Sequence, residues 1–260
     1  MDDMSTLITA VKKKQELRHL STQYIVRVAT EHKRLHPKVT FDALVKAVRA
    51  KARPYYGIYH QRVLQREELL AQKEFKALLT THKSTQERLD DYAQLYTTFQ
   101  PDIANKRIID IGCGFNPLSI VFAPYSIQHY HACDFCEEDM DFIHRCLDVL
   151  KQSHQVTTLD VIHDWNVLST LAFADTAFLF KVVDVFEQQK RFITYDLLPA
   201  IQAHVLLVSF SRTNIRGKTL TMQRRMWFEK ACDRLAYTYE HVIIGQEWFY
   251  RVLKNSNKSI

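Results

Sequence analysis

Two of the five glycines of this 260-residue chain stand one residue apart, at Gly112 and Gly114. They directly follow the apolar run 107–111, a predicted strand. Glycine is useful where the backbone must take a positive φ or approach a ligand closely. Asp134 comes twenty residues after Gly114, at the end of a second predicted strand. A carboxylate at that place can accept hydrogen bonds from the hydroxyls of a ribose. The spacing therefore indicates a ligand that contains a nucleoside.

Two kinds of nucleoside cofactor compete for such a turn. A dinucleotide site places a third glycine three residues after the second, where this chain has Pro117. S-adenosylmethionine (SAM) has no pyrophosphate to cradle, so the turn favours SAM over NAD or FAD. Asp160, at the end of a third apolar run, could accept a bond from the adenine amino group. The alternatives are a surface acid at Asp134 and a helix N-cap or a solvated side chain at Asp160.

The methyl acceptor is narrowed by motifs that the sequence lacks. Enzymes that methylate exocyclic amines of bases often carry an Asn/Asp-Pro-Pro-aromatic run after the fourth strand, and here residues 178–189 hold no proline. Pyrimidine C5 chemistry needs a cysteine nucleophile, and none follows the fourth or fifth predicted strand. Guanine N7 has an in-plane lone pair and loses no proton on methylation. Catalysis there rests on placement and on stabilising a cationic product, which suits a chain without an obvious general base.

The run Gly112–Leu118, GCGFNPL, resembles the cofactor motif of the Arm-type aminoglycoside-resistance methyltransferases. Members of that family methylate N7 of a guanine in the decoding region of 16S rRNA. The run from His82 to Arg88, His-x-Ser-Thr-x-Glu-Arg, is similar to a second family signature. The resemblance covers residues 40–254, with weaker matches at Tyr130–Asp134, Ser209–Phe210, Gly217–Lys218, Met222, Trp227–Glu229, and Gly245-x-Glu247 with Tyr250.

The resemblance implies a role for individual residues. Arg88 would hold the methionine carboxylate of SAM, Asp134 the ribose, and Asp160 would lie near the adenine. The predicted cofactor-binding residues are Arg88, Asp110, Gly112, Gly114, Asn116, Asp134 and Asp160. The predicted catalytic residues are Lys181 and Met222, and the predicted RNA-binding residues are Lys12, Lys13, Arg49, Lys51, Arg53, Arg212 and Lys218. No metal site is predicted. The chain departs from the family pattern on the acceptor side, at Asp184, Ser211 and Met226.

The elements that must position these residues differ between the two parts of the chain. Residues 101–260 alternate short apolar runs with helical stretches such as 137–153. The predicted strands are 107–111, 129–135, 157–162, 176–183, 204–210, 238–245 and 247–254. This alternation is typical of an α/β fold, a Rossmann-like SAM-dependent methyltransferase domain with a mostly parallel sheet. The last two strands should form an antiparallel hairpin at one edge.

Residues 1–100 show helical spacing and no convincing strand, so an all-helical domain should precede the methyltransferase domain of residues 101–260. Thr40 is a predicted N-cap for a helix that Pro54 ends. A single amphipathic helix is predicted for residues 62–79. Ser84 and Glu87 form a predicted capping box that opens a helix reaching Phe99.

Charge separates the two parts as well. The net charge is +6, and residues 1–100 hold 18 of the 35 basic residues but only 11 of the 29 acidic ones. The surplus fits either a solvated helical surface or a docking surface for a polyanion. The family resemblance implies that the partner is 16S rRNA in the assembled small ribosomal subunit. A non-catalytic RNA-binding factor, or methylation of another RNA or a protein, are the other functions that fit.

We expect a monomer, and the cysteine content fits the cytoplasm. The five cysteines show no regular spacing, which indicates buried thiols in a reducing compartment rather than disulfides. Redox or metal chemistry at Cys133-x-x-Cys136 is the alternative. No apolar run is long enough for a membrane span, and the N-terminus lacks a signal-peptide pattern.

Overall fold

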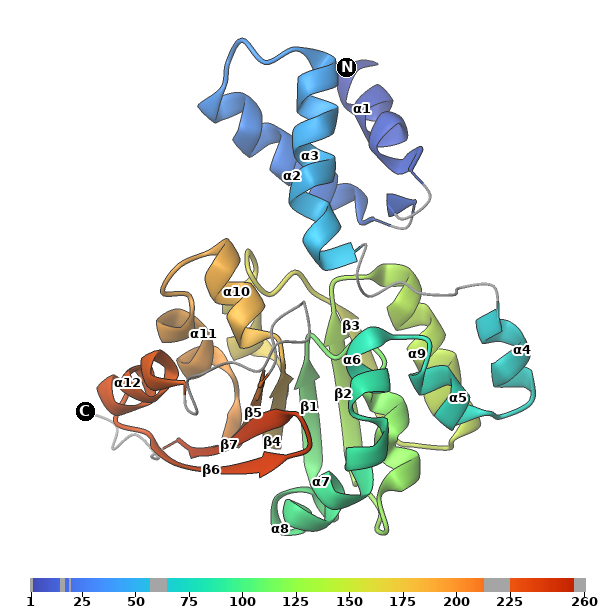
Figure 1. Cartoon of the computed structure of the whole chain (residues 1–260), viewed down its shortest axis with the longest axis vertical. Coiled ribbons are helices and arrows are strands. Elements are labelled where there is room, and N and C mark those ends of the chain that lie inside the picture. Colours follow the sequence, from blue (N-terminus) through green and yellow to red (C-terminus); the bar gives the residue numbers. More distant parts are fainter. Residues whose placement is uncertain (1, 15–16, 19, 57–64, 213–224, 255–260) are drawn as a thin grey trace.

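Three helices form a unit of their own in the computed structural model, at the top of Figure 1. The structure describes residues 2–14, 17–18, 20–56, 65–212 and 225–254. The three helices are α1 (Asp2–Lys12), α2 (Thr22–Leu35) and α3 (Phe41–Tyr56). Their apolar residues recur at helical spacing, so each helix buries one stripe against the other two. Leu7, Ile25 and Val48, one from each helix, lie in this shared core.

A second group of short helices packs on the sheet. It consists of α4 (Arg66–Ala71), α5 (Phe75–Leu79), α6 (Lys83–Glu87), the 3-10 helix η3 (Leu89–Asp91), α7 (Tyr92–Thr98) and α8 (Gln100–Ile103). Tyr92 and Tyr96 of α7 belong to the same hydrophobic cluster as strand residues such as Ile108 and Phe178. A domain boundary at residue 100 stays a prediction, although this cluster joins residues 70–103 to the sheet.

The sheet has seven strands in the order β3-β2-β1-β4-β5-β7-β6. The strands are β1 (Arg107–Ile111), β2 (His129–Asp134), β3 (His154–Thr158), β4 (Ala174–Phe180), β5 (Ala203–Ser211), β6 (Thr238–Ile244) and β7 (Glu247–Leu253). Strands β1 to β5 are parallel to one another, whereas β7 is antiparallel to both β5 and β6. The predicted α/β fold and the edge hairpin are therefore confirmed.

Helices cover both faces of the sheet (Figure 1). The remaining elements are η4 (Asn116–Phe122), α9 (Glu137–Val149), η5 (Trp165–Thr170), α10 (Val183–Gln189), α11 (Thr194–Ala200) and α12 (Met226–Arg234). Successive side chains of a strand point to opposite faces. Ile108 accordingly packs in the cluster with α7 and α9, and Ile109 in the cluster with α10 and α11. Strand order reverses between β1 and β4, and ligands bind at such switch points beyond the strand ends.

Several element boundaries differ from the predictions. Thr40 caps α3 as expected, with its Oγ1 accepting a bond from the Ala43 N–H at 3.4 Å. The helix nevertheless continues past Pro54, because a proline in the last turn removes only one backbone hydrogen bond there. The predicted helix 62–79 is broken into α4 and α5 at Lys73, whose φ of 58° is left-handed.

Two further corrections concern functional segments. The predicted capping box is wrong, because α6 already starts after His82 and Ser84 lies inside it. The third strand begins three residues earlier than predicted, since His154 pairs with Tyr130. Asp160 therefore lies in the loop after β3. All five cysteines are buried free thiols, as expected. In the described ranges, no helix combines the length and the apolar character needed to cross a membrane.

Candidate active site

The glycine turn lies between the ends of β1 and β2. Gly112 has φ 67° and Gly114 has φ 49°, both in the region that disfavours side chains. A Cβ on Gly112 would stand 2.6 Å from Val182 Cγ1, and one on Gly114 would stand 2.8 Å from His82 Cε1. The N–H groups of Gly112 and Cys113 donate to the Cys133 carbonyl at 2.8 and 3.1 Å. The turn therefore needs both glycines and is tied to the end of β2.

Asp134 is fixed by backbone donors around this turn. Its Oδ2 accepts from the Gly114 N–H at 2.8 Å, and its Oδ1 accepts from Phe135 at 2.7 Å and Cys136 at 3.4 Å. Burial raises the pKa of Asp134 to about 6, against the lowering effect of these N–H groups. A carboxylate has about four acceptor positions, so capacity for a ligand hydroxyl remains. The predicted ribose acceptor is thus ionised and oriented at neutral pH.

Two adjoining hollows meet at Asp134. Both are lined by Gly112, Asp134, Phe135, Val185 and Phe186. The first continues toward Gly114, His82 and Lys181, while the second continues toward Asp160 and Tyr24 of the helical unit. Together the two hollows form one cleft at the tips of β1, β2 and β4. Its apolar walls with a few polar groups are typical of a small-molecule site.

The wall contributed by the helical unit was missed by the sequence reasoning. Arg27 of α2 forms an ion pair with Asp160 at 2.5 Å, and Tyr24 lies one helical turn before it. Burial opposes ionisation of Asp160, but His163 and Arg27 together lower its pKa. Tyr24, Ile25 and Val28 at helical spacing predicted a helix, yet nothing in the pattern placed that helix beside the loop after β3.

A buried polar network stands behind the glycine turn. Asp110 Oδ2 accepts from Asn116 Nδ2 at 2.8 Å and from the Tyr130 hydroxyl at 2.6 Å. Burial raises the pKa of Asp110 to about 6. Its other oxygen, Oδ1, is buried without a hydrogen-bond partner among the described residues. An unsatisfied buried acceptor costs about 1–3 kcal/mol, although Asp110 is not among the residues that line the two hollows.

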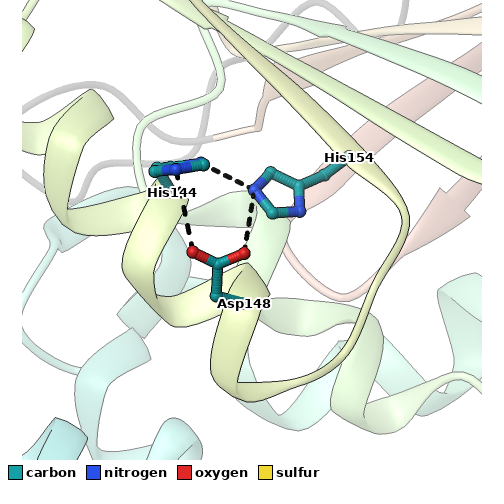
Figure 2. A group of neighbouring side chains, drawn as sticks. All are labelled: His144, Asp148 and His154. Carbon is teal, nitrogen blue, oxygen red and sulfur yellow. Dashed lines mark hydrogen bonds and ion pairs between the residues drawn. The ribbon is translucent and has the colours of Figure 1, made fainter.

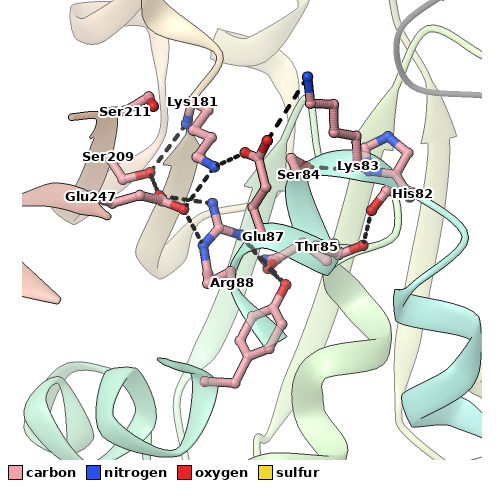
Figure 3. Close-up of polar contacts among 12 residues, drawn as sticks. His82, Lys83, Ser84, Thr85, Glu87, Arg88, Lys181, Ser209, Ser211 and Glu247 are labelled. Atoms are coloured by element: carbon pink, nitrogen blue, oxygen red, sulfur yellow. Dashed lines mark hydrogen bonds and ion pairs between the residues drawn. The ribbon is translucent and has the colours of Figure 1, made fainter. Parts of the chain in front are cut away.

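Arg88 is held by a buried ion pair (Figure 3). Its Nε and Nη2 donate to the two carboxylate oxygens of Glu247 at 3.0 and 2.9 Å. Nη1 donates to Asn116 Oδ1 at 3.2 Å and to the Tyr92 hydroxyl at 3.4 Å. These contacts use four of the five donors of a guanidinium. One N–H group of the guanidinium is left as a donor. The bond from Arg88 to the methionine carboxylate of SAM stays a prediction.

Lys181 lies at the junction of these groups, as Figure 3 shows. Its Nζ contacts Glu87 Oε2 at 2.8 Å and Glu247 Oε1 at 3.1 Å. Its φ of 60° is unusual for a residue other than glycine, and its backbone N–H donates to the Ser209 carbonyl at 3.0 Å. This strained position at the end of β4 turns Lys181 into the first hollow. Glu87 and Glu247 balance the charges of Lys181 and Arg88.

Glu247 and His82 belong to the runs that match the family, but no role was predicted for either residue. Glu247 accepts a fourth bond from the Ser209 hydroxyl at 2.6 Å. Burial opposes its ionisation, but the charges of Arg88 and Lys181 lower its pKa. His82 stacks on Phe115, with ring centroids 5.7 Å apart, and closes over Gly114. An acid opening the apolar strand EWFYRVL signals a buried cationic partner.

The predicted RNA-binding residues differ in their exposure. Lys13 is exposed, and Lys12 reaches the Thr22 hydroxyl at 3.3 Å. Lys51 pairs with Glu31 at 2.8 Å, and Arg49 donates to the Ala10 carbonyl inside the helical unit. Arg212 donates to the Gly245 carbonyl at 3.2 Å. The Arg53 side chain, Lys218 and the predicted catalytic Met222 lie outside the described residues.

Known proteins are similar to this chain in sequence and in fold. A family model described as ribosomal RNA methyltransferase (FmrO) matches residues 66–251. A Serratia marcescens protein named 16S rRNA (guanine(1405)-N(7))-methyltransferase is 25% identical, with 97% of this chain and 99% of that protein aligned. A Frankia casuarinae protein of the same name is 25% identical over 67% of this chain, and the match spans only 62% of that protein.

A solved structure is similar along the whole chain. The 16S rRNA methyltransferase RmtF, in complex with S-adenosyl-L-homocysteine, aligns with a TM-score of 0.84 at 20% identity. The alignment covers 98% of this chain and 99% of that one. The helical unit and the sheet of the present chain therefore have counterparts in one known fold.

Proposed function

Because this chain belongs to the FmrO family of ribosomal RNA methyltransferases, we propose that it transfers a methyl group from SAM to N7 of a guanine in 16S rRNA. The family resemblance of the run Gly112–Leu118 is confirmed by that membership. The observation that carries the proposal is the cleft around Asp134. Gly112 lines both of its hollows, and Gly114 lines the first. The cleft lies at the switch point of the sheet, where this fold binds its ligand.

The described residues fit the parts of SAM. Asp134 would accept hydrogen bonds from the ribose, with the glycine turn beneath it. Asp160 at the far end of the second hollow would accept from the adenine amino group. Asp110 Oδ1, which needs a donor, suits the ammonium group, and Arg88 retains one donor for the carboxylate. Asn116 would act indirectly, because it holds Asp110 and Arg88 in place.

The chemistry asks for placement rather than for a base. When bound, SAM supplies an electrophilic methyl group, and guanine N7 already has the lone pair that attacks it. Lys181 and its partners at the first hollow would orient the incoming base. The target base must leave its stack to reach the cleft. Met222 and Lys218 belong to residues 213–224, which connect β5 to α12, and they are proposed to contact that base.

The helical unit is proposed to dock on 16S rRNA in the assembled small subunit, with the protein acting as a monomer in the cytoplasm. Its support is the excess of basic over acidic residues in the first hundred residues. Contacts with phosphates dominate the affinity of such surfaces. Lys13 is exposed for this role, whereas Arg49 is engaged inside the unit and would act by holding α1 on α3.

A transfer assay tests the function directly. Purified protein is incubated with methyl-labelled SAM and intact small subunits, and label in rRNA is counted. Asp134→Ala should lose at least about tenfold in SAM affinity, since a charge-assisted hydrogen bond contributes about 1.5–3 kcal/mol. Asp141→Ala removes an exposed carboxylate from α9 and should transfer label at the normal rate.

The outcomes separate the competing functions. Label in 16S rRNA with the wild-type protein and not with Asp134→Ala supports the proposal. Binding to subunits without any transfer would instead indicate an RNA-binding factor that kept the fold. Label in another RNA, or in ribosomal protein, would move the substrate and overturn the 16S assignment.

A further inference from the structure

Two histidines and one aspartate converge where α9 ends and β3 begins (Figure 2). His144 and Asp148 are four residues apart on α9, so they lie on one face of the helix. His154 is the first residue of β3. His144 Nδ1 lies 2.7 Å from His154 Nε2, and the Asp148 oxygens lie 3.7 and 3.9 Å from the Nε2 atoms of His144 and His154. One potential ligand atom from each residue lies within 4.8 Å of the others.

The turn between the helix and the strand fixes this arrangement. Lys151 has a left-handed φ of 56°, and its N–H donates to the Asp148 carbonyl at 2.9 Å. The Gln152 N–H donates to the Leu147 carbonyl at 3.0 Å. These two bonds are those of a Schellman motif. The connection between α9 and β3 is therefore fixed by backbone hydrogen bonds, which hold His154 next to the last turn of α9.

His154 is oriented as a ligand by its second ring nitrogen. Its Nδ1 lies 2.8 Å from the Gln152 carbonyl, which can only accept, so Nδ1 carries the proton. Nε2 then directs its lone pair at His144 and Asp148. Metal-binding histidines are oriented in the same way, by a carbonyl or carboxylate on the other nitrogen. The side chain is 7% exposed, whereas those of His144 and Asp148 are 57% and 61% exposed and can adjust.

We propose that His144, Asp148 and His154 bind a divalent transition metal such as Zn²⁺. Two imidazoles and a carboxylate are ligands that zinc accepts, with water in the fourth position. Zinc–ligand bonds of about 2.0–2.2 Å place tetrahedral ligand atoms roughly 3.3 Å apart. The 2.7 Å between His144 Nδ1 and His154 Nε2 is shorter than that value, and the 3.9 Å between Asp148 Oδ1 and His154 Nε2 is longer. Rotation of the exposed His144 and Asp148 side chains would bring one ligand atom of each residue to the required separation. A metal replaces the hydrogen bond that the two histidines now share.

The site is structural rather than catalytic. His154 starts β3, whereas Asp134 ends the parallel neighbour β2, so the metal site and the cleft lie at opposite ends of these strands. Metal bound there would clamp α9 to the sheet that carries the glycine turn. It should raise thermal stability and leave methyl transfer unchanged.

Titration with Zn²⁺ alone, on untagged full-length protein in a chelator-free buffer, tests the site. Calorimetry should give one saturable site, and the Tm should rise by on the order of 5 °C at a hundredfold excess over Kd. His144→Asn and Asp148→Asn alter exposed side chains, so the fold is retained, and each should weaken binding at least about tenfold. His154→Gln should do the same. His204→Gln, an exposed histidine on β5, is the matched control and should bind like wild type.

Acidification should also weaken binding, because only neutral imidazole ligates a metal. All five cysteines are buried, so thiols do not compete for the probe in the native protein. The proposal is overturned if wild type shows no saturable Zn²⁺ binding up to millimolar concentration. It is equally overturned if all three ligand variants bind as tightly as wild type.

Discussion

At the scale of single residues, the site depends on buried carboxylates whose ionisation matters. Burial raises the pKa of Asp134 to about 6, well above the ordinary value. The ionised form is the better acceptor for ribose hydroxyls, so SAM affinity should fall as pH drops through that value. With a pKa near 6, lowering the pH from about 7.5 to about 5.5 should weaken binding about fourfold. Calorimetric titration with SAM at both pH values measures the effect.

The corresponding stability effect has the opposite sign. A carboxyl whose pKa is higher in the folded than in the unfolded protein favours the folded state when protonated. Stability contributed by Asp134 is therefore greatest below its unfolded pKa value near 4 and is lost as pH rises toward 6.

Asp134→Asn should flatten the pH dependence of SAM affinity. An affinity for SAM that is equal at both pH values in the wild type would contradict the assigned role.

The Arg88–Glu247 pair gives a second prediction at this scale. Glu247→Gln leaves the guanidinium buried without its counter-charge, and breaking such a pair costs about 3–5 kcal/mol. Urea unfolding followed by circular dichroism should show that loss. The double variant Arg88→Met, Glu247→Leu removes both charges and should recover much of it. A Glu247→Gln protein as stable as the wild type would show that the pair is not the link holding α6 to β7.

At the scale of elements, α2 is expected to act as a wall of the cofactor site. Arg27→Ala removes the partner of Asp160, and a partly exposed ion pair contributes about 0.2–1 kcal/mol. SAM binding should therefore weaken up to about fivefold. Arg34→Ala, an exposed arginine on the same helix, is the control. Equal SAM affinity in the wild type and in both variants would show that α2 does not form a wall of the cofactor site.

The elements also show what sequence patterns can predict. The strands, the glycine turn and Asp134 were predictable, because apolar runs and paired glycines report local geometry. The bond from Gly114 to Asp134 follows from parallel strands ending together. The break at Lys73 was not predictable, since a lysine at positive φ leaves no compositional trace.

Contacts between distant segments were the other omission. Arg88 and Glu247 are 159 residues apart, and Arg27 and Asp160 belong to different units. Periodicity reports which side of an element is buried but not what lies against it. The family signature predicted that Arg88 binds the cofactor, while only the folded chain shows that Glu247, Asn116 and Tyr92 already hold it.

At the scale of the whole molecule, the surplus of positive charge lies in the first hundred residues, and the exposed Lys13 and Lys14 there do not line the cleft, so docking and SAM binding should be separable. Replacing the exposed Lys13 and Lys14 by Glu should weaken binding to small subunits and reduce its dependence on salt. The SAM affinity of this variant should stay normal. Lys230→Glu on α12 changes an exposed lysine far along the chain and serves as the control. A larger loss with Lys230→Glu would place the docking surface elsewhere.

The most direct test of the central claim is to map N7-methylated guanines in rRNA from cells with and without the protein. Reduction and chain cleavage at N7-methylguanine, followed by primer extension, locates each modified base. One additional N7-methylated guanine is expected in 16S rRNA when the wild-type protein is present, and none with Asp134→Ala. An unchanged 16S rRNA in cells that contain folded, SAM-binding wild-type protein would contradict it.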